Sequence, residues 1–185
     1  MHLLASKPGG FSDEEGIVDL EQSAADIVIL SAADSALAAL AASVETLPAD
    51  FPSVRLANWM QLLKPAAYDL YEDKVLSRAK IVVVSMLGGA NYWQYGFERL
   101  CQWVEASNSS NDETRQLILV PGDDALDAQL IAASSVPETD AVRVWQYLRA
   151  GGLHNNQQLF YFLATQFLDE RYPWQEAQSL SLIHI

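Results

Sequence analysis

The chain has 185 residues, half of them hydrophobic and 19% charged, which is enough for one globular domain with its own core. Its 24 acidic and 11 basic residues give a formal net charge of −13, which argues against a nucleic-acid partner and against docking on an anionic membrane. No segment approaches the roughly 20 apolar residues of a membrane helix, and the first residues lack a signal-peptide pattern. Cys101 is the only cysteine, so no internal disulfide or thiolate zinc cluster can form. We therefore expect a soluble, cytoplasmic protein.

Short apolar segments separated by stretches of helical length indicate strands that alternate with helices. The predicted strands are Met1–Ala5, Ile27–Ser31, Val54–Asn58, Ile81–Ser85 and Leu117–Val120. The predicted helices are Ser35–Leu47 with Asp34 as its N-cap, Asp69–Lys80, and Phe97–Ala106, which is followed by a solvated loop, Ser107–Glu113. This alternation predicts a parallel sheet of about five strands in a flavodoxin/Rossmann-like α/β domain that covers residues 1–124.

The pattern changes to helices alone after residue 124. One predicted helix carries Val142, Trp145, Tyr147 and Leu148, and the next carries Leu159, Phe160, Phe162, Leu163 and Phe167. We expect residues 125–179 to form a helical extension that leads into missing downstream domains. Residues 180–185 resemble the translation of a sequencing adaptor, which suggests that an incomplete gene runs into adaptor sequence near Ser179.

The run from Ile81 to Gly96 locates a candidate binding site. Four consecutive β-branched residues predict a strand buried on both faces, and an aromatic-amide cluster follows it. Ligands of open α/β sheets bind outside the carboxyl ends of the strands, so this cluster could form a stacking wall for a flat macrocycle. The candidate substrate-binding residues are Gly88, Gly89, Asn91, Tyr92 and Trp93. The alternative, which we favour for Tyr92 and Trp93, is that these rings pack against neighbouring segments.

Other motifs give no catalytic constellation. Gly88-Gly89 lacks the flanking residues of a phosphate loop, so the pair is interpreted as a tight strand-to-helix turn. Asp123-Asp124 could hold a divalent cation, but a turn with a helix N-cap is the more common role of such a pair. His2, His154 and His184 have no ligand spacing, and His154 is expected in a loop. No serine lies in a G-x-S-x-G elbow. We predict no catalytic residue and no metal ligand.

Several segments in order resemble the amino-terminal part of the large, CobN-type subunit of aerobic cobaltochelatase. Each motif alone is weak, but their succession from residue 1 to about residue 179 is specific. The segments that carry the resemblance are Met1–Ala5, Asp26–Asp34, Phe51–Arg55, Leu87-Gly88-Gly89 with Tyr92-Trp93 and Tyr95, Val120–Asp124, and Gly151-Gly152 with Asn155 or Asn156.

The resemblance implies a role in cobalamin biosynthesis, the ATP-dependent insertion of Co²⁺ into hydrogenobyrinic acid a,c-diamide. It also implies two partner subunits, an AAA+ ATPase that binds ATP with Mg²⁺ and a metal-site adaptor protein. The large subunit would bind the corrinoid, with its catalytic residues downstream, so that this chain would carry no cofactor and be inactive alone. Two alternatives stay open: a magnesium chelatase large subunit, and a free-standing flavodoxin-like binding module.

Overall fold

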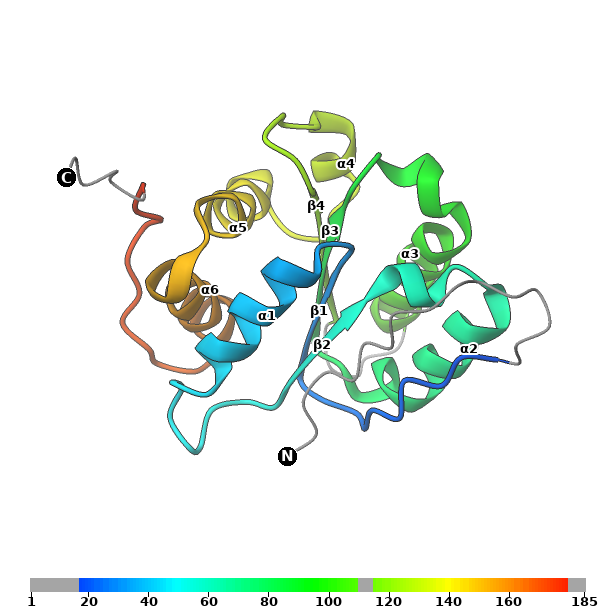
Figure 1. Ribbon diagram of the computed structural model, residues 1–185, viewed down its shortest axis with the longest axis horizontal. Helices are drawn as coiled ribbons and strands as arrows, with labels where there is room; N and C mark the ends of the chain where they lie inside the picture. The colour runs from blue at the N-terminus through cyan, green and yellow to red at the C-terminus, as the bar shows by residue number, and fades with distance from the viewer. Residues whose placement is uncertain (1–16, 110–114, 180–185) are drawn as a thin grey trace.

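Four parallel strands form one sheet in the computed structural model, which describes residues 17–109 and 115–179 (Figure 1). The strands are β1 (Ile27–Ser31), β2 (Val54–Asn58), β3 (Ile81–Met86) and β4 (Gln116–Pro121). Their order is β2-β1-β3-β4, and Ile27 of β1 pairs with Val54 on one side and Ile81 on the other. The α/β fold with a parallel sheet is confirmed. The fifth predicted strand, Met1–Ala5, lies outside the described residues.

The apolar character of the strands on both faces follows from the two layers of helices that cover the sheet. Successive side chains of a strand point to opposite faces, so Ile29 and Val83 enter one core while Val28 and Val82 enter the other. All four of these side chains are fully buried. A strand that is central in a covered parallel sheet must be apolar on both faces, as β1 and β3 are.

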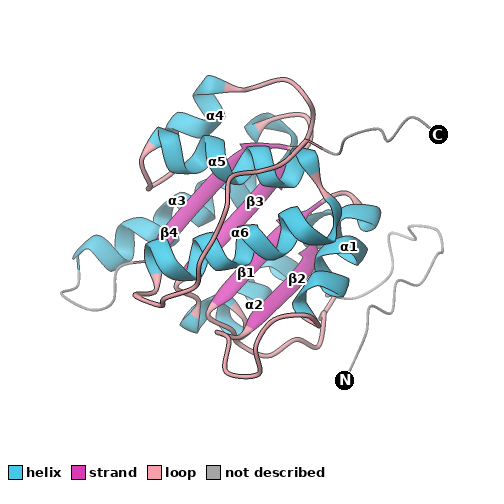
Figure 2. Cartoon of the chain, turned by 90° about the vertical axis from the view of Figure 1, so that its left-hand side faces the viewer, coloured by secondary structure: helices cyan, strands magenta, loops and turns pink. Residues whose placement is uncertain are grey.

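Helices cover both faces of the sheet (Figures 1 and 2). On one face lie α2 (Pro65–Lys74), α3 (Gln94–Ser109) and the 3₁₀ turns η1 (Trp59–Leu62), η2 (Leu76–Arg78) and η3 (Ala90–Trp93). The other face is covered by α1 (Asp34–Val44), α5 (Glu138–Ala150) and α6 (Gly152–Phe167), with the short α4 (Ala128–Ala132) at the β4 edge. Residues predicted as a helical extension thus supply much of one layer around the sheet. None of the helices in the described part of the chain is long and apolar enough to cross a membrane.

Several local expectations are wrong. Ala33, not Asp34, is the N-cap of α1, and the Asp34 carboxylate instead accepts a hydrogen bond from the Asn58 side chain at 2.8 Å. The helix predicted over Asp69–Lys80 begins earlier, because Pro65 at its first position starts it. It ends at Lys74 and is followed by the separate 3₁₀ turn η2. Residues 107–109 belong to α3 rather than to a loop, and residues 110–113 lie outside the described part. His154 lies in the first turn of α6, not in a loop.

An extended C-terminal segment, Leu168–Ser179, follows α6 and packs back onto α5 and α6. Buried amide side chains of α6 bind its main chain. The Asn155 amide donates to the Gln178 carbonyl at 2.8 Å and accepts from the Gln178 N–H at 2.9 Å, and Gln158 accepts from the Gln175 N–H at 2.8 Å. Tyr147 of α5 donates its hydroxyl proton to the Gln175 carbonyl. These bonds satisfy main-chain groups that a segment without secondary structure would leave unpaired.

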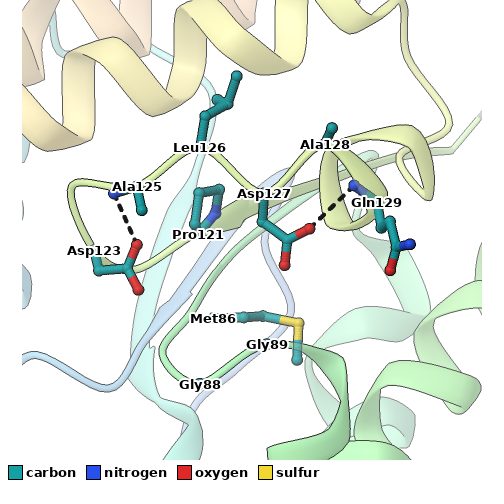
Figure 3. A pocket seen from close by; sticks show the side chains of 10 residues that line it. All are labelled: Met86, Gly88, Gly89, Pro121, Asp123, Ala125, Leu126, Asp127, Ala128 and Gln129. Atoms are coloured by element: carbon teal, nitrogen blue, oxygen red, sulfur yellow. Dashed lines mark hydrogen bonds between the residues drawn. The ribbon is translucent and has the colours of Figure 1, made fainter.

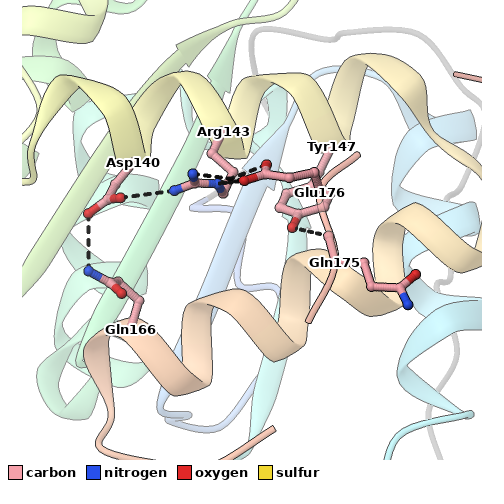
Figure 4. Close-up of polar contacts among 6 residues, drawn as sticks. All are labelled: Asp140, Arg143, Tyr147, Gln166, Gln175 and Glu176. Carbon is pink, nitrogen blue, oxygen red and sulfur yellow. Dashed lines mark hydrogen bonds and ion pairs between the residues drawn. The ribbon is translucent and has the colours of Figure 1, made fainter. Parts of the chain in front are cut away.

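Arg143 of α5 fixes the same segment by its charge (Figure 4). Its guanidinium donates to both carboxylate oxygens of Glu176 and lies 3.3 Å from the largely buried carboxylate of Asp140. The hydrogen bond to Glu176 raises the pKa of Arg143. The guanidinium also stacks within 5.0 Å of the Trp174 ring and 5.2 Å of the Phe162 ring. The C-terminal segment is therefore an integral part of the fold.

Candidate functional site

The loop after β3 turns on two glycines with backbone angles that other residues rarely adopt. Gly88 has φ +81° and Gly89 has φ +75° with an extended ψ of −177°, a combination essentially restricted to glycine. This turn carries the chain from the carboxyl end of β3 into η3 and then α3. The predicted strand-to-helix turn is thus present. The turn therefore places two residues without side chains beside the carboxyl edge of the sheet.

Trp93 lies in the core. Its ring stacks on Trp59 with centroids 5.3 Å apart and meets Tyr68 edge-on at 5.7 Å, and its indole N–H donates to the Leu62 carbonyl at 3.2 Å. A Cβ atom at Gly96 would stand 2.0 Å from the Trp93 ring, so only glycine fits there. Trp93 therefore packs against neighbouring segments and presents no free ring face to a ligand.

Asn91 and Tyr92 are exposed, unlike Trp93. The Tyr92 side chain is 58% exposed and makes an edge contact with the core residue Trp59, with ring centroids 5.9 Å apart. The hydroxyl of Tyr95, later in the same run, donates to the Asp69 carboxylate at 2.6 Å. That hydrogen bond raises the pKa of Tyr95. Asn91 and Tyr92 are consequently free to contact a ligand or a partner.

A cleft of about 400 Å³ lies between the loops that follow β3 and β4 (Figure 3). Met86 and Pro121, the last residues of these strands, contribute to its wall, together with the Gly88-Gly89 turn. The remaining lining residues come from the β4 loop and the start of α4: Asp123, Ala125, Leu126, Asp127, Ala128 and Gln129. The cleft therefore lies at the carboxyl edge of the sheet, where the sequence predicts a site.

The aspartates of the β4 loop have separate tasks. Asp127 is the N-cap of α4, and its Oδ1 accepts from the N–H groups of Gln129 and Leu130 at 3.0 Å each. Asp123 closes a turn by accepting from the Ala125 N–H at 3.0 Å, whereas Asp124 pairs with Arg149 at 3.0 Å. The predicted turn at Asp123 is present, but the helix cap is Asp127. Among the described residues, no group of three or more His, Cys, Asp or Glu side chains is arranged to hold a metal ion.

The structure brings together only part of the predicted site. Gly88 and Gly89 line the cleft, whereas Asn91 and Tyr92 lie outside its wall. Sequence reasoning missed the contribution of the β4 loop, above all Asp127. A signal was present, because an aspartate directly before the Ala128–Ala132 stretch has the pattern of an N-cap. Contact of the five predicted residues with substrate stays a prediction.

The strand order and the open carboxyl edge define a three-layer α/β domain of the flavodoxin-like class. A scan against models of protein families finds none that matches. The aerobic cobaltochelatase subunit CobN of Pseudomonas aeruginosa is 46% identical over 97% of this chain, and that of Sinorhizobium sp. is 36% identical over 84%. Over the residues that match, the chain belongs to the CobN family of cobaltochelatase subunits.

A solved structure agrees with this assignment. The catalytic subunit of cobaltochelatase from Mycobacterium tuberculosis matches 83% of the chain with a TM-score of 0.65 and 27% identity. The chain spans 14% and 12% of the length of the two curated relatives and 11% of the length of the solved one. It therefore corresponds to one domain-sized part of a much larger subunit.

Proposed function

We propose that this chain is a domain of the large subunit of an aerobic cobaltochelatase. In this role it takes part in the ATP-dependent insertion of Co²⁺ into hydrogenobyrinic acid a,c-diamide during cobalamin biosynthesis. The observation that carries the proposal is the 46% identity to a CobN subunit over 97% of the chain. Both curated relatives and the solved structure are named for cobalt, which supports cobaltochelatase over a magnesium chelatase.

The proposal assigns the chemical step to other parts of the enzyme. ATP with Mg²⁺ would bind an AAA+ ATPase subunit, and a second, adaptor subunit would connect it to the large subunit. The Gly88-Gly89 turn supports this division, because no Lys or Arg stands between Lys80 and Arg99 to neutralise a phosphate. This domain would then support the structure of the subunit or bind substrate or a partner. The complex would work in the cytoplasm.

A chimeric large subunit tests the proposal. In it, this chain replaces the matching 180 residues of the Pseudomonas aeruginosa CobN subunit. Combined with the two partner subunits, ATP and Co²⁺, the chimera should insert cobalt at a rate within about tenfold of the parent subunit. The isolated chain under the same conditions should show no insertion.

Two controls make the result decisive. A chimera with Leu30→Asp, which places a carboxylate in the fully buried core, should lose activity because the domain cannot fold. Replacing Co²⁺ and the corrinoid with Mg²⁺ and a porphyrin should give no product. A folded chimera that is inactive with cobalt, or active with magnesium, would contradict the proposal.

A further inference from the structure

Exposed apolar side chains gather in the two loops at the carboxyl edge of the sheet. In the described residues, six large hydrophobic side chains are exposed, and three of them follow β3 or β4. These are Leu87, Tyr92 and Leu126, which are 52%, 58% and 49% exposed. The two loops are adjacent, since the Gly122 N–H donates to the Met86 carbonyl at 2.8 Å. Apolar side chains concentrated at one edge are typical of an interaction site.

Two of the residues that line the cleft, Gly88 and Gly89, have no side chain. At Gly88 a Cβ atom would contact the Tyr92 ring at 3.4 Å, and at Gly89 it would face the Asp127 carboxylate at 3.9 Å. Figure 3 shows the Asp127 side chain directed toward the Gly88-Gly89 turn, while Leu126 points away from it at the rim. The absence of a side chain at Gly89 therefore leaves the space in front of the Asp127 carboxylate open.

The charge of the cleft favours one kind of occupant. Asp123 and Asp127 line it, and no basic side chain of the described residues forms an ion pair with either. Arg149 of α5 is engaged by the neighbouring Asp124 instead. A carboxylate-bearing tetrapyrrole such as an acid diamide would be repelled by these two aspartates. A polypeptide that carries Lys or Arg beside an apolar side chain complements both the charge and the rim.

We propose that the carboxyl-edge surface, formed by Leu87, Tyr92, Asp123, Leu126 and Asp127, is the docking surface for another part of the same large-subunit polypeptide. The docked part is a loop or helix that presents an apolar side chain flanked by Lys or Arg. This inference rests on the proposed function, because the curated relatives are far longer and the chain spans only 14% and 12% of them. Burial of the three apolar side chains provides the affinity, and the two carboxylates fix the register.

Hydrogen exchange measured by mass spectrometry tests the proposal. The amides of residues 87–93 and 122–129 are compared between the isolated chain and the chimeric subunit described above. Docking should slow their exchange by about tenfold or more in the chimera. The amides of β1 and β3 should exchange equally slowly in both proteins and report that the domain is folded. Equal exchange of the two loops in both proteins overturns the proposal.

Charge variants of the chimera provide a second measurement that does not depend on the isolated chain. Leu126→Asp and Tyr92→Asp should each restore fast exchange in both loops, because the variant loses an apolar contact and would have to bury a carboxylate against the apolar side chain of the partner. Leu153→Asp is the matched control, since Leu153 is 54% exposed but lies on α6. Its chimera should keep both loops protected. Loss of protection in all three variants, or in none, contradicts a specific docking surface.

Two further arms separate this proposal from its alternatives. Protection that appears only after hydrogenobyrinic acid a,c-diamide is added would make the cleft a substrate site and overturn docking. An active chimera with exposed loops refutes docking and leaves the proposed function intact. An inactive, folded chimera with protected loops supports docking and refutes the proposed function for this chain.

Discussion

The loop after β3 and the C-terminal segment after α6 are both irregular, but they differ in their contacts. The C-terminal segment is hydrogen-bonded to buried side chains of the domain, and the loop exposes its side chains to solvent. In the C-terminal segment, main-chain groups of Gln175 and Gln178 are bound by buried side chains of α5 and α6. In the loop after β3, Tyr92 stands in solvent beside a cleft whose carboxylates form no ion pair within the described residues. The polar groups of the C-terminal segment are thus bound within the domain, whereas the loop after β3 exposes side chains that a partner could contact.

This difference separates residues that maintain the fold from residues available for binding. Buried polar groups such as Asn155 and Gln158 are tolerated because they are hydrogen-bonded, and their role is structural. Exposed apolar groups such as Tyr92 and Leu126 bury little surface in the isolated domain, and the proposed docking gives them a role. Substitutions in the two regions should therefore differ in their effect on stability.

The largest loss of stability is expected for Arg143→Met. The change removes the contacts to Glu176 and Asp140, and Asp140, with its side chain only 9% exposed, is left without its counter-charge. Breaking such a partly buried pair should lower the free energy of unfolding by about 2–3 kcal/mol. Urea unfolding followed by tryptophan fluorescence measures it.

Arg149→Met is the matched control on the same helix. Its partner Asp124 is 88% exposed, so the loss should be about 0.5 kcal/mol or less. Equal losses for the two arginines would show that the C-terminal segment contributes no more to stability than the open edge does.

A smaller loss is expected for Gly89→Ala in the loop after β3. The new Cβ meets only Asp127 at 3.9 Å, so the cost arises from the backbone, which combines φ +75° with ψ −177°. Such a conformation should cost about 1–2 kcal/mol in thermal or urea unfolding. Ala125→Ser, in the opposite wall of the cleft, should change stability by about 0.5 kcal/mol or less. A neutral Gly89→Ala would mean that the turn relaxes and that the cleft is not held open by it.

The sheet could be predicted because its strands carry a strong local signal. Runs such as Ile27–Leu30 and Ile81–Val84 are apolar at every position, and only strands covered on both faces require that. The helix boundaries were less certain, because they depend on single residues. Pro65 starts α2 four residues before the apolar spacing becomes visible, and α6 begins directly after the glycine that ends α5, which places His154 in a helix.

The sequence predicted at which edge of the sheet a site would lie, but not all of the residues that line the cleft there. The rule that ligands bind at the carboxyl ends of parallel strands placed the predicted site at the edge where the cleft lies. The separation of Tyr92 from Trp93 could not be predicted, because it depends on Trp59, Tyr68 and Gly96, which are distant in sequence or carry no side chain. Aromatic neighbours in sequence look alike until tertiary contacts decide which one is buried.

The smallest expected effect is on the pH dependence of stability, and it concerns Tyr147, which is bound to the C-terminal segment. Burial raises the pKa of this tyrosine from 10.0 to about 12, while its hydroxyl donates to the Gln175 carbonyl. The unfolded chain releases the proton from pH 10 upward, whereas the folded chain retains it until about pH 12. Folding stability that is fully present below pH 10 is therefore lost as the pH rises toward 12.

Tyr147→Phe should lose about 1 kcal/mol at neutral pH, because the Gln175 carbonyl is left without its donor. Its stability should then fall less steeply with pH than that of the parent chain, by up to one proton. The remaining slope reflects other tyrosines such as Tyr68 and Tyr71, whose pKa values burial also raises. Parallel slopes for the parent and Tyr147→Phe would show that the C-terminal segment leaves Tyr147 in solvent.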